Sequence, residues 1–136
     1  METLNVSILD DNMFFLKLFH ERISRHSMQL ELGSGNRINI QSYTSYLQFL
    51  DQFDNSTDLV FLDFDLGGGF NAIGVIDELK KGKYMPKIAI ITEHQGISKL
   101  PSDSLKYIDS YIKKDNYVIP KSCLLIQDLM EEKFSA

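Results

Sequence analysis

The hydrophobic and polar positions of this chain follow two alternating patterns. Short apolar or alternating runs of strand length recur five times, and segments with apolar residues three or four positions apart lie between them. The predicted strands are Leu4–Leu9, Arg37–Gln41, Asp58–Asp63, Pro86–Thr92 and Ile108–Ile112. Strands that alternate with helices are typical of a parallel sheet with helices on both faces. The sequence therefore predicts an α/β fold.

Helical periodicity is clear in four segments and absent from a fifth. The apolar positions of the four predicted helices are Phe15, Phe19 and Ile23; Tyr46, Leu47, Leu50 and Phe53; Phe70, Ile73, Ile76 and Leu79; and Leu125, Ile126, Leu129 and Met130. Asp11 or Asn12 is expected to cap the first helix, and Pro120 fits the first turn of the last. Residues 32–36 predict a flexible turn. Between residues 93 and 105 the sequence leaves open whether a regular fourth helix forms, because Pro101 interrupts the pattern.

Composition narrows the class of protein. A length of 136 residues favours a single domain that spans residues 1–136. The net charge of -5 argues against direct nucleic-acid binding, which needs clustered lysine and arginine. No apolar run is long enough for membrane insertion, and no basic, then apolar, leader opens the sequence. With a single cysteine and no secretion signal, the expected location is cytoplasmic.

Chemically active side chains stand where the predicted strands end. Asp10 and Asp11 follow the first strand, Asp63 ends the third, Thr92 ends the fourth, and Lys113 or Lys114 follows the fifth. The carboxyl ends of parallel strands form the ligand-binding edge of an open α/β sheet. Acids gathered there resist ionisation unless a cation joins them, and carboxylate oxygens suit Mg2+. A carboxylate in such a site can act as a nucleophile toward a phosphoryl group, and Asp63 is the candidate.

These motifs together resemble the receiver domains of two-component response regulators, over essentially the whole chain. The matching residues are Ile8–Asn12 for the first strand and acid pair, Asp58–Asp63 for the phosphoacceptor strand, Thr92 for the hydroxyl, and Tyr111–Asp115 for the aromatic-to-lysine run. The resemblance implies a flavodoxin-like sheet of order 2-1-3-4-5. It also implies a stand-alone signalling domain that is not an enzyme in its own right.

The resemblance implies a Mg2+ site around the acceptor. Asp63 would accept a phosphoryl group from a histidine kinase or a histidine phosphotransfer protein and would also contact the metal. Asp11 would bind Mg2+ directly, and Asp10 would bind it through water. Asp65, two residues after the acceptor, would offer its backbone carbonyl.

Further roles implied by the resemblance concern the bound phosphate and the output. Lys114, three residues past the aromatic Tyr111, would pair with the phosphate, with Lys113 as the fallback. Thr92 would move its hydroxyl onto a phosphate oxygen, and Tyr111 would follow inward. A downstream protein effector would read the change on the fourth helix, fifth strand and fifth helix. The sequence leaves open whether the protein forms a homodimer and whether it ends a pathway or passes phosphate on.

The sequence departs from the receiver pattern at two positions, and two other functions remain open. Leu66-Gly67 replaces the Met-Pro that is common after the acceptor, which predicts a looser loop, and Glu93 follows Thr92 where a small residue is frequent.

Asp63-Phe64-Asp65 also resembles the Asp-x-Asp of haloacid-dehalogenase-type phosphatases, although that motif normally ends the first strand. The other alternative is a receiver-like interaction module that is no longer phosphorylated.

Overall fold

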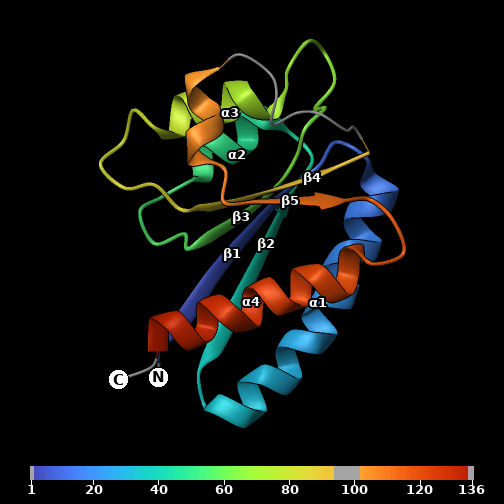
Figure 1. The fold of residues 1–136 in the computed structure, drawn as a ribbon, viewed down its shortest axis with the longest axis vertical. Helices are drawn as coiled ribbons and strands as arrows, with labels where there is room; N and C mark the ends of the chain where they lie inside the picture. The colour runs from blue at the N-terminus through green and yellow to red at the C-terminus, as the bar shows by residue number, and fades with distance from the viewer. Residues whose placement is uncertain (1, 94–101, 135–136) are drawn as a thin grey trace.

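The computed structural model describes residues 2–93 and 102–134. In this part of the chain, strands and helices alternate, with a short 3-10 helix before the last strand (Figure 1). The bounds are β1 Thr3–Leu9, α1 Met13–Ser34, β2 Arg37–Tyr43, α2 Tyr46–Gln52, β3 Leu59–Asp63, α3 Ala72–Leu79, β4 Lys87–Thr92, η2 Asp103–Tyr107, β5 Ser110–Lys113 and α4 Val118–Phe134.

The five strands form one parallel sheet in the order β2-β1-β3-β4-β5. This confirms the order 2-1-3-4-5 that the resemblance implied. Leu9 pairs with Leu62, and Thr92 pairs with Lys113, so the central strands end nearly level with one another. The residues that end these strands therefore meet at one edge of the sheet.

Helices cover both faces of the sheet, as predicted. α1 and α4 pack on one face, and α2, α3 and η2 lie on the other (Figure 1). All five residues of β3 are buried, and its side chains alternate between the two layers. Phe61 packs edge-on against Phe19 of α1, with ring centroids 5.2 Å apart, whereas Leu62 joins Phe49 of α2 in the opposite core. A strand buried on both faces explains the continuous apolar run in the sequence.

The first helix is longer than the sequence predicted. Asn12 is its N-cap, because its side chain accepts a hydrogen bond of 3.1 Å from the backbone N–H of Phe15. The helix then continues to Ser34 and ends at Gly35, which has a φ of 77°. The predicted turn is therefore wrong for residues 32–34. Of the two glycines in the segment, the second, Gly35, ends the helix, because it adopts the left-handed conformation.

Three of the four residues predicted for the apolar face of the second helix, Tyr46, Leu50 and Phe53, are half-buried against the core, but the prediction missed Phe49. Ser45 caps α2 by accepting a hydrogen bond of 3.2 Å from the backbone N–H of Gln48. Phe49 is fully buried, whereas Leu47 is 68% exposed. Placing Leu47 on the apolar face was wrong, because so short a helix does not turn every apolar residue of its sequence toward the sheet.

The third helix begins later than predicted. Asn71 caps α3, with its side-chain oxygen 2.9 and 3.2 Å from the backbone nitrogens of Ile73 and Gly74. Phe70 lies before the helix and stacks on Tyr46 of α2, with ring centroids 4.5 Å apart. The aromatic residue that was expected to open the apolar face of α3 thus ties the preceding loop to α2.

The chain between β4 and β5 contains η2 in its described part. The Ser104 side chain, 1% exposed, donates a hydrogen bond to Asp77 of α3, and Lys80 Nζ lies 3.2 Å from Ser104 Oγ. β5 begins at Ser110, two residues later than predicted. The prediction at Pro101 falls outside the described residues. η2 is thus fastened to α3 by polar contacts.

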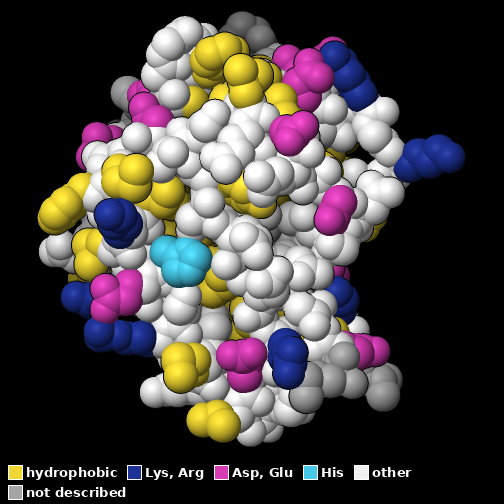
Figure 2. All heavy atoms as spheres, turned by 180° about the vertical axis from the view of Figure 1, so that it is seen from behind, with side chains coloured by type: hydrophobic (Ala, Val, Ile, Leu, Met, Phe, Trp, Pro, Cys, Tyr) yellow, Lys and Arg dark blue, Asp and Glu magenta, His cyan; other side chains and the backbone are white. Residues whose placement is uncertain are grey.

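Charged side chains of both signs are interspersed on the face opposite to that of Figure 1. Figure 2 shows lysine and arginine separated by aspartate and glutamate, with hydrophobic side chains between them. This face carries no continuous stripe of positive charge. Across residues 2–93 and 102–134, no helix has both the length and the apolar character that a membrane crossing requires.

Candidate functional site

The ends of four strands bring the predicted site residues to one edge of the sheet. Asp10 directly follows β1, Asp63 ends β3, Thr92 ends β4, and Lys114 directly follows β5. The backbone N–H of Lys114 donates a hydrogen bond of 2.8 Å to the carbonyl of Thr92, which extends the β4–β5 pairing beyond Lys113. The positions of these side chains are thus set by the register of the sheet.

Lys114 joins two buried carboxylates. Its Nζ lies 2.9 Å from Oδ2 of Asp10 and 3.4 Å from Oδ1 of Asp63. The exposed fractions of the Lys114, Asp10 and Asp63 side chains are 13%, 2% and 10%. The same Nζ lies 4.4 Å from the ring centroid of Phe15, a cation–π contact that helps to hold the ammonium group inside the molecule.

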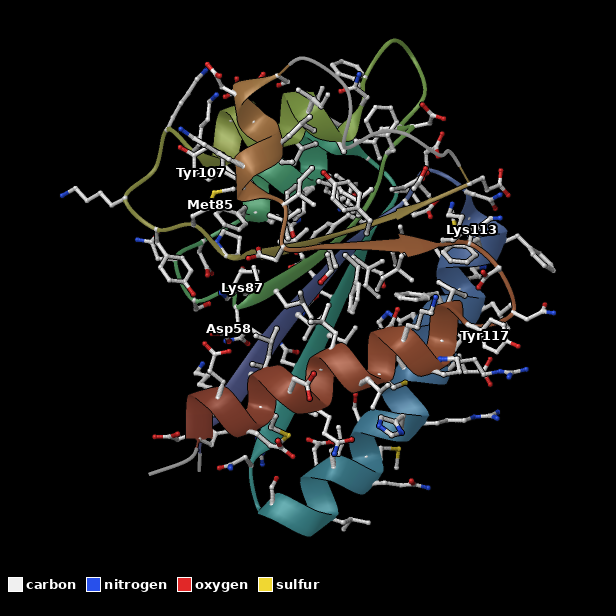
Figure 3. All side chains as sticks on the ribbon, in the orientation of Figure 1. Asp58, Met85, Lys87, Tyr107, Lys113 and Tyr117 are labelled. Carbon is white, nitrogen blue, oxygen red and sulfur yellow. The ribbon has the colours of Figure 1, made fainter. Side chains whose placement is uncertain are left out.

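The geometry separates the two lysines that the sequence left as candidates. Lys113 lies at the end of β5, far from Asp58 and Lys87 at the opposite ends of β3 and β4 (Figure 3). Its side chain is exposed and forms no ion pair with any residue that the structure describes. Successive residues of a strand point to opposite sides, so only Lys114 reaches the acids.

Burial and neighbouring charge raise the pKa of Asp63 to about 7. Burial is the largest cause, and Asp10 adds to it, while Lys114 acts in the opposite direction. Burial disfavours the charged form of Lys114 as well, but the carboxylates of Asp10 and Asp63 outweigh it, and the pKa of Lys114 is raised. The positive charge of Lys114 therefore does not fully balance the negative charge of the carboxylates, and a further cation would be stabilised here.

Asp11 completes a group of three carboxylates. Asp10, Asp11 and Asp63 each offer an oxygen, and these oxygens lie within 4.8 Å of one another. Asp11 is exposed, whereas the other two are buried. A cluster of carboxylate oxygens with one open side suits a hard cation such as Mg2+, which keeps several water ligands. The donor set fits the metal that the sequence implied.

Asp65 and Thr92 occupy the expected positions, and their implied roles stay predictions. Thr92 is 4% exposed at the end of β4. Asp65 follows β3 and pairs with Asn71 through an isolated antiparallel bridge. The Asp65 side chain does not belong to the group of three carboxylates. The contact with the metal that was predicted for Asp65 would therefore be made by its backbone carbonyl. Glu93, the bulky neighbour of Thr92, is exposed.

The loop between β3 and α3 is closed by hydrogen bonds, in contrast to the looser loop that was expected. Leu66 N–H donates to the carbonyl of Phe70 at 3.1 Å, and Phe70 N–H donates to the carbonyl of Gly67 at 2.9 Å. Gly67, Gly68 and Gly69 all have positive φ angles, of 73°, 57° and 83°. A proline, whose φ is fixed near -65°, could not take the conformation of Gly67. The glycines thus build a defined turn.

The roles of two residues at the site were not predicted from the sequence. Phe15 was assigned only to the buried face of the first helix, and nothing in its spacing pointed to Lys114. Gly67 was assigned to a turn, but a Cβ atom built on it would lie 3.0 Å from Oδ2 of Asp11. Both contacts join segments that are distant in sequence.

Tyr111 lies on the outer side of β5. Its side chain is 43% exposed, whereas its neighbour Ile112 is 5% exposed. The inward movement that the resemblance implied for Tyr111 would start from this exposed position. The movement itself stays a prediction.

Comparisons of the fold with solved structures converge on one class, although the sequence alone finds no match. No protein-family model and no curated protein matches the sequence. A response regulator receiver domain from Clostridium thermocellum superposes with a TM-score of 0.69 at 17% identity, over 96% of each chain. A CheY-like receiver domain from Methylobacillus flagellatus gives a TM-score of 0.69 at 16% identity, over 94% of this chain and 99% of that one.

A third comparison agrees with these two. The receiver domain of a Francisella response regulator gives a TM-score of 0.67 at 15% identity, over 96% of this chain and 98% of that one. At such low identities the likeness concerns the fold. The chain has the flavodoxin-like fold of response regulator receiver domains.

Proposed function

We propose that this protein is a phosphoacceptor receiver domain that takes a phosphoryl group onto Asp63 in the presence of Mg2+. The observation that carries the proposal is the position of Lys114, within 2.9 Å of Asp10 and 3.4 Å of Asp63, beside three carboxylates that fit a divalent cation. The receiver fold supports the same conclusion.

In the proposed reaction, an Asp63 carboxylate oxygen attacks the phosphorus of a phosphohistidine. The phosphorus–nitrogen bond breaks, a phosphorus–oxygen bond forms, and the imidazole leaves with the bonding electron pair. Lys114 neutralises a phosphoryl oxygen, because its ammonium group already lies beside Asp63. Positioning and charge neutralisation account for most of the catalysis of phosphoryl transfer.

The cation would be held by Asp11, Asp63 and the backbone carbonyl of Asp65, with Asp10 acting through water. Bound there, Mg2+ neutralises charge on the phosphoryl group. Asp10 is engaged at Oδ2 by Lys114 and at Oδ1 by the backbone N–H of Asn12, 2.8 Å away. Both oxygens of Asp10 thus already have donors, which favours an indirect contact with the metal.

The phosphate donor in this proposal is a histidine kinase or a histidine phosphotransfer protein, and the readout is a protein effector. Thr92 would turn its hydroxyl toward the phosphate, and Tyr111 would leave its exposed position. Such a coupled movement would be a two-state switch biased by phosphate contacts. The same chemistry serves an end point of a pathway or a phosphate shuttle.

Phosphorylation by small donors tests the proposal. The protein is incubated with Mg2+ and either acetyl phosphate or phosphoramidate, whose phosphorus–nitrogen bond resembles that of phosphohistidine. Intact-mass measurement should find one phosphoryl group that hydroxylamine removes and that is absent in Asp63→Asn. Asp51→Asn, at an exposed aspartate of α2, is the matched control and should be modified like the wild type.

The other outcomes identify the rival functions. A protein that binds Mg2+ but forms no adduct with either donor would be an interaction module. Continuous release of phosphate from varied monoesters, abolished in Asp63→Asn, would indicate the phosphatase.

A further inference from the structure

We propose that Gly67 is a positioning residue for the cation site, because the absence of a side chain there leaves the room that the Asp11 carboxylate occupies. This inference rests on the proposed function, since it concerns the Mg2+ that Asp11 would bind. It assigns a specific task to the loop between β3 and α3.

The loop backbone passes directly against Asp11. A Cβ atom at position 67 would lie 3.0 Å from Oδ2 of Asp11, closer than carbon and oxygen pack comfortably. A Cβ atom at position 69 would meet no atom within 4 Å. The contact is therefore particular to Gly67 and does not extend to the whole turn.

The loop cannot easily retreat from Asp11, because both of its ends are anchored. Leu66 is 8% exposed in the core of the α2–α3 face, and Phe70 stacks on Tyr46 with ring centroids 4.5 Å apart. Phe70 is also bonded to the carbonyl of Gly67 across the turn. A side chain added at position 67 would thus meet a backbone that is held in place.

The Asp11 carboxylate would move instead. Asp11 is exposed, and among the described residues no hydrogen bond or ion pair holds its side chain. One of its carboxylate oxygens forms a group with oxygens of Asp10 and Asp63, all within 4.8 Å of one another. Because the two oxygens of a carboxylate move together, a shift of a few tenths of an ångström at Oδ2 changes the donor geometry. Mg2+ is sensitive to such a shift, because it requires near-octahedral ligands at about 2.0–2.1 Å, whereas Ca2+ accepts longer and more varied bonds.

Two alanine variants separate this effect from backbone strain. Gly67 and Gly69 have similar φ angles, 73° and 83°, so alanine should strain the backbone similarly at both positions. Only Gly67→Ala should disturb Asp11. If alanine prevents folding, Gly67→Asn and Gly69→Asn carry the same Cβ atom, and asparagine tolerates positive φ better.

Isothermal titration calorimetry with Mg2+ and, separately, Ca2+ measures the effect. Gly67→Ala should weaken Mg2+ binding roughly tenfold, the lower range for changes that disorient a metal ligand, and should weaken Ca2+ binding less. Gly69→Ala should bind both ions as the wild type does. In an Asp11→Ala background, Gly67→Ala should weaken Mg2+ binding no further.

Failure of the inference and failure of the proposed function give different results. Wild-type Mg2+ affinity in a folded Gly67→Ala protein, or an equal loss in Gly69→Ala, overturns the inference and leaves the proposed function standing. A wild-type protein that binds no Mg2+ overturns the metal-dependent function and the inference with it.

Discussion

Lys114 Nζ lies closer to Asp10 than to Asp63, at 2.9 Å and 3.4 Å from their carboxylate oxygens. The lysine is thus tied most tightly to an acid that would not carry the phosphate. Asp10 is 2% exposed and would be a buried, unpaired charge without it. This ion pair keeps the lysine at the site while it leaves Asp63 less fully paired.

Removing the lysine should therefore destabilise the protein. Lys114→Met leaves two buried carboxylates without their cation, and such a loss typically costs about 3–5 kcal/mol of the free energy of unfolding. Lys113→Met, at the exposed neighbour, should change it by less than about 0.5 kcal/mol. Urea unfolding at pH 7.5 without divalent ions measures both. Equal stabilities of the two variants would contradict the buried ion pair.

The raised pKa of Asp63 predicts a pH dependence of stability with a definite sign. The pKa of this carboxyl is about 7 in the folded protein, against an ordinary value of 3.8. The folded state therefore holds a proton that the unfolded state has lost, and the contribution of Asp63 to stability falls as the pH rises from about 4 to about 7.

Asp63→Asn should remove this penalty. Without divalent ions at pH 7.5, the variant should exceed the wild type by roughly 1–3 kcal/mol in free energy of unfolding, and the difference should disappear near pH 4. Urea unfolding across this pH range provides the measurement. A variant less stable than the wild type at pH 7.5 would mean that Asp63 is ionised and well paired in the folded protein.

Mg2+ should stabilise the wild-type protein through mass action. A ligand that binds only the folded state raises the melting temperature as its concentration rises above the dissociation constant. Asp11→Ala should abolish the increase, because it removes the exposed member of the carboxylate group. Differential scanning calorimetry with and without Mg2+ reads the effect. Asp51→Ala, on the exposed side of α2, should retain it.

The polar contact between α3 and η2 should contribute measurably to stability. The buried hydroxyl of Ser104 donates to Asp77, which also pairs with Lys80 at 3.1 Å. Ser104→Ala should lower the free energy of unfolding by about 1–2 kcal/mol. Combined with Asp77→Ala, it should cost less than the sum of the single losses, because both remove the same hydrogen bond. Asp103→Ala, at an exposed residue of η2, is the control.

The N-cap of α3 should matter for both stability and the loop before it. Asn71 accepts hydrogen bonds from two backbone N–H groups, and its own backbone pairs with Asp65. Asn71→Ala should cost about 1–2 kcal/mol, whereas Asn71→Ser, which can still cap, should cost less. Thermal unfolding compares the two. Equal losses would show that the side-chain cap is unimportant here.

The sequence by itself determined the class of fold and the location of the candidate site. Strands such as β3 are buried on both faces, so their apolar runs are visible without any structure. The grouped residues were Asp10, Asp11, Asp63, Thr92 and one of the two lysines at 113 and 114. They could be grouped because parallel strands place their carboxyl ends at one edge, whatever the detailed packing. These features depend on local pattern and on topology.

Only the tertiary structure decided the contacts between distant segments. It selected Lys114 over Lys113, placed Phe15 against that lysine, and brought Gly67 against Asp11. It also showed that α1 continues through residues 32–34 and that Leu47 is exposed. Local sequence patterns record which residues can be buried or capped. Which side chains meet depends on packing across the whole chain, because a contact's free energy arises only when both partners are in place.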